Sequence, residues 1–203
     1  MQVKLTNIGK KFHEKWVFKN LTLDFEPGLH HAILGKNGSG KSTLIKIIAG
    51  YLSATTGKVT WLFNKQAMPP EKVFRHVAVA SPYLELIQEF NIREAIAFQK
   101  KFKPFREGYS EKDLEEISGL SAHLNKPLKH FSSGMRQRVS LLLAIMSSAE
   151  LVLLDEPCAN LDSEATQWYQ DLVQEFCTSR SLIIASNHHP AEYASCENIH
   201  SLP

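Results

Sequence analysis

Alternation of apolar and polar residues predicts strands in the first part of the chain. Residues 3–6 (VKLT) and 21–25 (LTLDF) carry an apolar side chain at every second position, and a further strand is expected over residues 58–63. A period of two places the apolar side chains on one face of a strand and the polar ones on the other. We therefore expect the early strands to pack one face on a core and to expose the other to water.

Later runs are apolar almost throughout and predict strands that are buried on both faces. They are residues 29–35 (LHHAILG), 76–80 (HVAVA), 151–155 (LVLLD) and 182–186 (LIIAS), with a last strand near Ile199. Continuous apolar strands are typical of parallel sheets that have helices packed on both faces.

Helical spacing of apolar residues separates these strands. Residues 42–48 and 133–146 predict two helices, Ser163 is expected to cap a third helix that runs to about Cys177, and a short helix is expected near residues 190–195. Strands that alternate with helices predict an α/β fold with a largely parallel sheet.

The middle of the chain, residues 84–128, is expected to be mostly helical. Asn91 with Glu94, and Ser110 with Asp113, have the spacing of a capping box, in which two side chains satisfy free backbone N–H groups at a helix start. A helical pattern follows each pair.

Composition is that of an ordinary globular domain. The chain has 203 residues, of which 43% are hydrophobic and 22% charged, and its formal net charge is +2. This length suits one domain, and the charge balance lacks the basic footprint of nucleic-acid-binding proteins, so we expect no nucleic-acid partner. No apolar run is long enough to span a membrane, no signal peptide is evident, and three scattered cysteines predict a reducing cytosolic compartment.

Residues 35–42 (GKNGSGKS) match the phosphate-binding pattern G-x-x-x-x-G-K-[ST], between an expected strand and an expected helix. The glycines allow the backbone N–H groups to form a nest around an anion, and the helix start adds its positive end. Lys41 is expected to reach the β- and γ-phosphates of a nucleotide, Ser42 to bind Mg²⁺ and Thr43 to contact the α-phosphate. The predicted nucleotide contacts in this loop are Gly35, Lys36, Asn37, Gly38, Ser39, Gly40, Lys41, Ser42 and Thr43.

Two carboxylates end the strand at 151–155. Asp155 is expected to hold Mg²⁺ through water, as in other P-loop enzymes. Glu156 follows it and is expected to point toward the γ-phosphate, where it would orient a water molecule and accept its proton. Alone, an apolar strand ending in Asp-Glu is more often a strand that meets solvent, so this interpretation depends on the phosphate loop.

These motifs and their order resemble those of ABC-type ATPases, the nucleotide-binding subunits of ABC transporters, over about residues 12–188. Residues 131–138 (FSSGMRQR) resemble the family signature LSGGQ, and they precede Asp155 as in the family. Residues 159–162 (ANLD) resemble the D-loop, and residues 183–189 (IIASNHH) resemble the strand that leads to the switch histidine. In its Ser-Ser-Gly-Met signature and its short length, the chain is similar to small exporter-type subunits such as the haem-exporter ATPase of cytochrome c maturation.

The resemblance implies a fold and a division of the chain. The fold is a P-loop NTPase core with a mostly parallel sheet, an N-terminal antiparallel β subdomain and a helical lobe. Residues 1–203 would form a single ABC ATPase domain, with a core lobe over 1–80 and 149–203 and a helical lobe with the signature over about 84–148.

The resemblance also implies roles for single residues. His188 is the better match to the switch histidine that contacts the γ-phosphate, and His189 is the second match. Phe12 stands where the family has an aromatic residue that stacks on adenine. Outside this context, His188 would more often be a surface histidine, and Phe12 could belong to the core.

A head-to-tail dimer with two sandwiched ATP molecules is a further implication of the resemblance. Each ATP would lie on the phosphate loop of one subunit and under Ser132 and Gly134 of the other, and Asp162 would lie at the interface. The segment Ser132–Gly134 is also a natural helix N-cap. Whether two identical or two different ATPase chains pair stays open.

Two departures from the family pattern stand out. Ser133 and Met135 replace the first glycine and the glutamine of the signature, whereas Ser132 and Gly134 are kept. The Q-loop glutamine should follow the strand at 76–80, where this chain has Ser81-Pro82-Tyr83. Either Gln88 substitutes through a rearranged loop, or other groups couple the nucleotide site to a membrane partner.

The leading hypothesis is an ATP-hydrolysing subunit that docks from the cytoplasmic face on a separate transmembrane permease. The docking surface would lie in the helical lobe, where the apolar cluster of Tyr83, Leu84, Leu86 and Ile87 either receives a permease helix or belongs to the core of the lobe. The alternatives are a soluble ABC ATPase that acts on ribosomes or DNA, and a P-loop phosphotransferase. The second of these leaves residues 131–138 and 159–162 unexplained.

Overall fold

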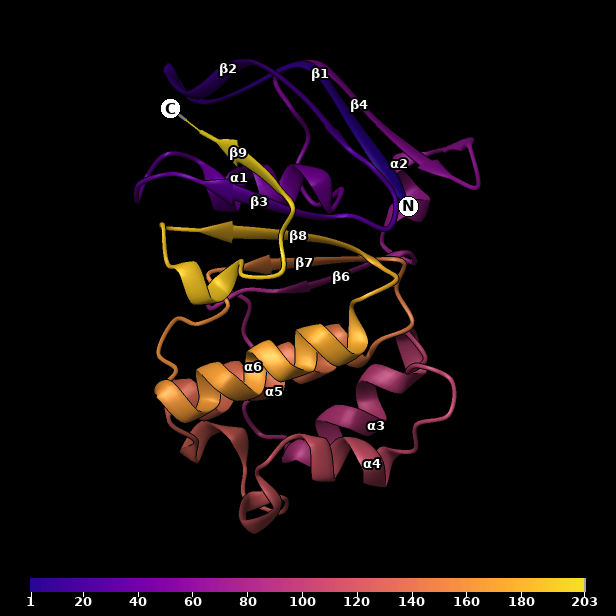
Figure 1. Ribbon diagram of the computed structural model, residues 1–203, viewed down its shortest axis with the longest axis vertical. Helices are drawn as coiled ribbons and strands as arrows, with labels where there is room; N and C mark the ends of the chain where they lie inside the picture. Colours follow the sequence, from indigo (N-terminus) through magenta and orange to yellow (C-terminus); the bar gives the residue numbers. More distant parts are fainter. Residues whose placement is uncertain (203) are drawn as a thin grey trace.

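Two sheets organise the protein in the computed structural model, which describes residues 1–202 (Figure 1). The antiparallel sheet has the order β2-β1-β4-β5, and the parallel sheet has the order β6-β7-β8-β3-β9. The antiparallel strands are β1 (Gln2–Phe12), β2 (Lys15–Phe25), β4 (Thr56–Phe63) and β5 (Gln66–Met68). The parallel strands are β3 (His30–Leu34), β6 (Val77–Ala80), β7 (Leu151–Asp155), β8 (Ser181–Ser186) and β9 (Asn198–Ser201).

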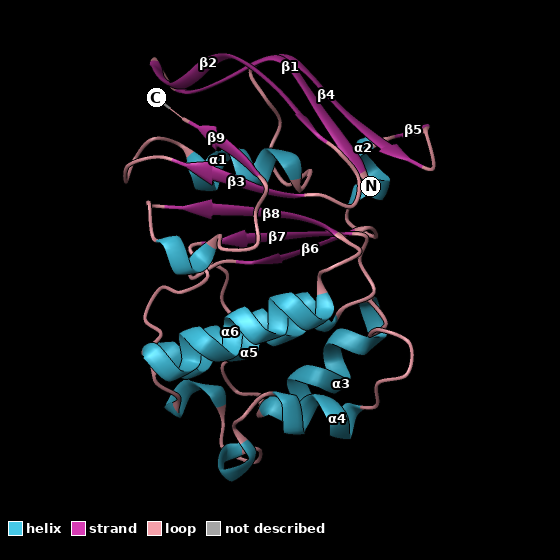
Figure 2. Cartoon of the chain, viewed as in Figure 1, coloured by secondary structure: helices cyan, strands magenta, loops and turns pink. Residues whose placement is uncertain are grey.

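Helices and the antiparallel sheet cover the two faces of the parallel sheet (Figure 2). The α-helices are α1 (Lys41–Ile48), α2 (Pro70–Val73), α3 (Ile92–Phe102), α4 (Glu111–Ile117), α5 (Ser133–Met146) and α6 (Ser163–Phe176). Three short 3₁₀ turns are η1 (Ser121–His123), η2 (Leu128–His130) and η3 (Pro190–Glu192). Helices α5 and α6 lie on one face, with α3 and α4 beyond them, and α1 and the antiparallel sheet lie on the other (Figure 1). The α/β fold with an antiparallel β subdomain is confirmed.

Strand β7 shows why the buried strands lack alternation. Leu151 and Leu153 pack in the apolar cluster around α1, whereas Val152 and Leu154 pack in the cluster around α5 and α6. Since both faces of the parallel sheet are covered, every side chain of the strand is removed from water. Within residues 1–202, no helix combines the length and the hydrophobicity that a membrane span requires.

Both capping boxes are confirmed. Asn91 Oδ1 accepts a hydrogen bond from Glu94 N at 3.0 Å, and Glu94 Oε2 accepts one from Asn91 N at 2.8 Å. Ser110 and Asp113 form the same reciprocal pair at the start of α4. The local chemistry of these residues therefore sets where α3 and α4 begin.

The start of α6 differs from the prediction. Ser163 was expected to be the cap, but Ser163 is the first helical residue and Asp162 is the N-cap, with its Oδ1 accepting a hydrogen bond from Ala165 N at 2.8 Å. Asp162, one residue earlier, has the extended backbone of an N-cap and a carboxylate that accepts the hydrogen bond. Ser163 is therefore the first residue of the helix. The short elements β5 and α2 were also not expected, because each spans fewer than five residues.

Removing the α6 cap should destabilise the nucleotide-free protein. Asp162→Ala is expected to lower the free energy of unfolding by about 1 kcal/mol, because the N–H of Ala165 loses its acceptor. Ser163→Ala, one residue along, is the matched control and should change stability much less. Urea denaturation monitored by circular dichroism measures both, and equal losses would contradict the assignment of the cap.

Candidate functional site

The candidate phosphate site lies at the edge of the parallel sheet where the strands end (Figure 1). The register pairs Leu34 of β3 with Ser186 of β8, and Asp155 of β7 with Ala185 of β8. The loops that follow β3, β7 and β8 therefore leave the sheet side by side. In open parallel sheets, this edge is the usual place for ligands.

The loop after β3 has a backbone that requires glycine. Gly38 and Gly40 have φ of +83° and +99°, in the left-handed region, and Gly40 is the N-cap of α1. A Cβ on Gly40 would lie 2.4 Å from Val17 Cγ1 of β2, so a larger residue at this position would also clash with β2. The loop is tied to the sheet by Gly35 N, which donates to Ser186 O at 3.3 Å.

Lys41 is held beneath this loop. Its side chain is 5% exposed, and Nζ donates to Gly35 O at 2.8 Å and to Lys36 O at 3.2 Å. Glu156 Oε1 lies 3.6 Å from the same Nζ. An ammonium group has three N–H donors, so two are used by the loop and the third faces the carboxylate.

The other loop residues surround this lysine. Lys36, Asn37 and Gly38 are exposed, whereas Ser42 and Thr43 at the start of α1 are half-buried. Ser39 Oγ is buried, and it has no hydrogen-bond partner among the described residues. The loop therefore offers both backbone and hydroxyl donors to a ligand.

Asp155 is almost fully buried at the end of β7, where it is 1% exposed. Burial raises the pKa of its carboxyl, and hydrogen bonds from the Ser42 and Ser81 hydroxyls oppose that rise. Its Oδ2 accepts from Ser81 Oγ at 3.2 Å, and its Oδ1 has no partner within residues 1–202. A buried free carboxylate oxygen beside the Ser42 hydroxyl is a set of hard oxygen donors that fits Mg²⁺.

Glu156 has a strained backbone. Its φ is +46°, a left-handed value that is uncommon for a residue other than glycine, and its N–H donates to Ala185 O at 2.8 Å. This conformation turns the chain out of the sheet and directs the half-buried carboxylate toward Lys41. Strain of this kind clusters at functional sites.

Ser132 and Gly134 lie at the start of α5. Ser132 is the N-cap, and its exposed Oγ accepts from Met135 N at 3.2 Å. A Cβ on Gly134 would lie 2.6 Å from Asn160 O, so α5 packs too closely on the loop before α6 for any larger residue. Among the described residues, no hydrogen bond or ion pair joins residues 132–134 to the loop at 35–43, so one chain does not bring the two together.

The starts of α1 and α5 differ from those of the other α-helices in the charge of their first turn. Helices α2, α3, α4 and α6 carry Asp or Glu in their first turn, whereas α1 and α5 carry none. Acidic side chains stabilise the positive end of a helix, and a bound anion would be repelled by them. The two predicted phosphate sites are therefore the helix starts without an internal negative charge.

The remaining predicted contacts lie on exposed loops. His188 is exposed with φ of +57°, and His189 N donates to Ser186 Oγ at 3.1 Å. Phe12 at the end of β1 is 47% exposed, with Lys10 Nζ at 5.0 Å from its ring centroid. Phe12 is thus outside the core. Asp162 is exposed at the start of α6.

Ser81 is the residue that sequence reasoning missed. Gln88 is the candidate substitute for the Q-loop glutamine, but its side chain is exposed, and within residues 1–202 its one hydrogen bond is from Lys129 N to its backbone carbonyl at 2.9 Å. Ser81 is 6% exposed at the end of β6 and donates directly to Asp155. The available signal was a hydroxyl at the end of the strand that pairs with β7.

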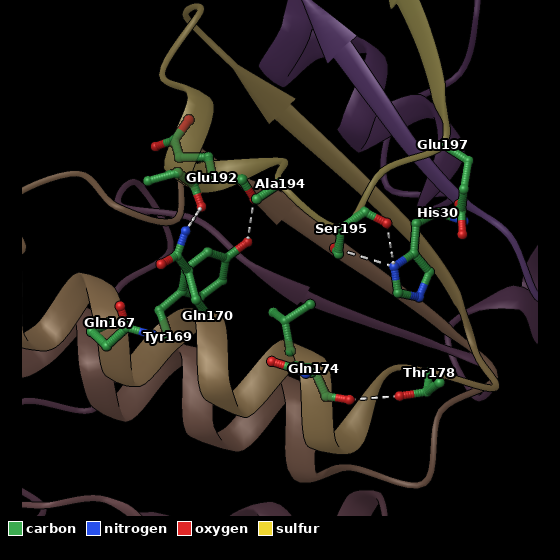
Figure 3. Close-up of a pocket in the computed structure, with 12 residues that line it drawn as sticks. His30, Gln167, Tyr169, Gln170, Gln174, Thr178, Glu192, Ala194, Ser195 and Glu197 are labelled. Atoms are coloured by element: carbon green, nitrogen blue, oxygen red, sulfur yellow. Dashed lines mark hydrogen bonds between the residues drawn. The ribbon is translucent and has the colours of Figure 1, made fainter.

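A cavity of about 480 Å³ on the outer side of α6 is separate from this site (Figure 3). His30, Tyr169 and Gln170 line it, and it includes none of the predicted nucleotide contacts. His30 is satisfied there by hydrogen bonds to Ser195 and to Cys177 O.

Comparisons with known proteins agree with this geometry. Residues 18–159 match the model of a protein family described as "ABC transporter". The spermidine/putrescine import ATP-binding protein PotA of Thermotoga maritima is 33% identical over 82% of this chain, which spans 46% of PotA. The cytochrome c biogenesis ATP-binding export protein CcmA of Rhizobium johnstonii is 28% identical over 87% of this chain and 83% of its own length.

Solved structures agree at the level of the fold. A dimeric ATP-binding cassette in a post-hydrolysis state with ADP and phosphate superposes with a TM-score of 0.84 at 23% identity, covering 98% of this chain and 94% of the other. A family model that spans most of the chain, and a glycine loop and acidic strand end that meet at one lysine, point to the same conclusion. The chain belongs to the ABC transporter family, as an ATP-binding subunit that hydrolyses ATP.

Proposed function

We propose that this subunit binds ATP with Mg²⁺ on the loop at 35–43, hydrolyses it with Glu156 as general base, and thereby powers a separate transmembrane permease from the cytoplasmic face. The observation that supports this best is the position of Lys41. Its ammonium group lies between the carbonyls of the glycine loop and the carboxylate of Glu156.

Phosphate binding would exchange the partner of one Lys41 donor. In the structure, the third N–H group of Lys41 faces Glu156. The β- and γ-phosphates of ATP would accept from this donor and from the backbone N–H groups at the start of α1, which have no acidic competitor. Glu156 is then released from the lysine and is free to act on water.

Ser42 and Asp155 would hold the magnesium ion, Ser42 through its hydroxyl and Asp155 through a water molecule on its unpartnered oxygen. The ion supplies charge neutralisation of the phosphate oxygens when it is bound. Ser81 would orient Asp155, because its hydroxyl donates to the other carboxylate oxygen.

Hydrolysis would then depend on three groups around the γ-phosphate. Glu156 would orient a water molecule and take its proton, while Lys41 and the helix N–H groups stabilise the charge of the transferred group. His188, on the loop after β8, would contact the γ-phosphate from the other side. Phe12 would stack its exposed ring on adenine.

A second ATPase chain would complete the site. Ser132 and Gly134 lie at a helix start that is partly exposed and has no acidic residue in its first turn, and no hydrogen bond in the described chain joins it to the loop at 35–43. In a head-to-tail pair, they would meet the γ-phosphate held by the other subunit, with Asp162 close to the interface. The nucleotide would then join two positive helix ends, and its hydrolysis would release them.

An apolar patch marks the proposed permease contact on the helical lobe, about residues 84–148. Tyr83, Leu84 and Ile87 are 69%, 40% and 41% exposed, so most of the predicted cluster lies outside the core, whereas Leu86 packs partly against it. This patch follows Ser81 directly in sequence. A permease helix docked on the patch would therefore lie a few residues along the chain from Ser81, whose hydroxyl donates to the Asp155 carboxylate at the proposed magnesium site.

Loss of the loop lysine should weaken nucleotide binding. Lys41→Ala is expected to raise the Kd for ATP by about tenfold or more, since hydrogen bonds to a charged group are worth about 1.5–3 kcal/mol. Lys46→Ala, an exposed lysine of the same helix, is the control. Fluorescent-nucleotide binding measures both, and equal affinity in the Lys41 variant and the wild type would contradict the phosphate loop.

Neutralising the general base should separate binding from turnover. Glu156→Gln is expected to bind ATP with the wild-type affinity or better, to hydrolyse it about 10²–10⁴-fold more slowly, and to form an ATP-dependent dimer. Steady-state phosphate release and size-exclusion chromatography measure these effects, with Glu175→Gln on the exposed side of α6 as the control. Rapid hydrolysis by the Glu156 variant would remove this residue from the base role.

Ser81 should affect the magnesium dependence more than the nucleotide affinity. Ser81→Ala is expected to raise the Mg²⁺ concentration at half-maximal ATPase activity by about tenfold, as for other partners that orient a metal ligand. The exposed Ser148→Ala is the control. An unchanged Mg²⁺ titration curve would show that the hydroxyl does not orient Asp155.

A further inference from the structure

Three metal-ligating side chains meet next to the candidate site. Cys158 lies on the loop after β7, His189 on the turn after β8, and Glu192 in η3. One ligand atom from each lies within 4.8 Å of the ligand atoms of the other two. These residues are far apart in sequence, and the parallel pairing of β7 with β8 brings their loops together.

Glu192 is the strongest sign of a missing ligand. Its side chain is 5% exposed, and its Oε1 accepts from Cys158 N at 3.0 Å. Its Oε2 is buried without a partner in the described part of the chain. A buried oxygen without a partner is costly, and a cation would satisfy it.

The segment that carries Glu192 is held rigidly on α6. Tyr169 OH donates to Glu192 O at 2.7 Å, and Gln170 Nε2 donates to Ala191 O at 3.1 Å (Figure 3). His189 is fixed at the other end of the turn, where its N–H donates to Ser186 Oγ. Two of the three ligand residues are therefore positioned by backbone contacts that do not involve their side chains.

The donor set selects the kind of cation. One sulfur, one imidazole nitrogen and one carboxylate oxygen are typical of Zn²⁺ and related ions, whereas Mg²⁺ prefers oxygen alone. Three protein ligands leave a fourth tetrahedral position for water. The exposed His189 gives an entry path from solvent.

We propose that Cys158, His189 and Glu192 form a site for a thiophilic divalent cation of the Zn²⁺ class, distinct from the magnesium site at Ser42 and Asp155. Binding replaces the thiol proton by the metal, so that Cys–SH and M²⁺ give a Cys–S–M bond and H⁺.

Occupancy of this site would restrain the catalytic loops. Cys158 is two residues from Glu156, and His189 adjoins His188. A metal that joins Cys158 to His189 would tie the loop after β7 to the loop after β8 and hinder the adjustment that nucleotide binding requires. We therefore expect this cation to inhibit turnover, a consequence that rests on the proposed function, whereas metal binding itself does not.

Cobalt titration of the full chain without nucleotide tests the site. Co²⁺ should bind once per chain with a thiolate-to-cobalt charge-transfer band in the near ultraviolet. Cys158→Ser should abolish the band, and Cys196→Ser, a half-buried cysteine outside the cluster, should keep it. Absence of the band in the wild type, its persistence in the Cys158 variant or its loss in the Cys196 variant would overturn the site.

Two further measurements, of Co²⁺ binding and of Zn²⁺ inhibition, do not depend on the folding of the Cys158 variant. His189→Ala changes an exposed residue, and it should weaken Co²⁺ binding by more than about tenfold; unchanged binding would overturn the site. Zn²⁺ should inhibit the ATPase activity of the wild type at concentrations that leave the His189 variant at its own zinc-free rate. Equal inhibition of both would overturn the regulatory consequence alone, and absence of any zinc-free ATPase activity would count against the proposed function instead.

Discussion

The candidate site is held together by the contacts of the Lys41 ammonium group. This group is nearly buried, and it is held by two carbonyls of the loop that it supports and by the carboxylate of Glu156. A buried charge without partners would be unfavourable, so the loop, the lysine and the acidic strand end stabilise one another. In the proposed mechanism, the phosphates of ATP would compete for the same donor, so binding of ATP and release of Glu156 from Lys41 would be a single exchange.

The parallel sheet makes this contact possible. Strand β8 lies between β3 and β7, so the glycine loop and the acidic pair are two strands apart, and the long side chain of Lys41 brings its ammonium group to Glu156. The same edge receives Ser81 from β6 and the histidine loop from β8. Covering both faces of the sheet with apolar layers fixes the register, and the register fixes which loops become neighbours.

The two loops around β7 and β8 carry more chemistry than nucleotide hydrolysis requires. Glu156 and His188 are the proposed nucleotide contacts on these loops, whereas ligand atoms of Cys158, His189 and Glu192 lie close to one another a few residues away. In the proposed arrangement, a cation bound to the second group would restrain the loops that carry the first. Ser81, which donates to Asp155, is followed in sequence by the exposed patch at Tyr83, Leu84 and Ile87. The candidate magnesium site is therefore connected through a short stretch of chain to an apolar part of the surface.

The glycine loop, the capping boxes at Asn91 and Ser110, and the buried character of β7 could be predicted from local sequence, because each depends on residues within a few positions of one another. Even locally, the carboxylate of Asp162 displaced Ser163 as a cap, since two good capping residues stood side by side. Three contacts could not be predicted in this way: Ser81 with Asp155, Gly134 with Asn160 O, and Glu192 with Cys158. Those contacts follow from strand order and helix packing, which join segments that no local pattern connects.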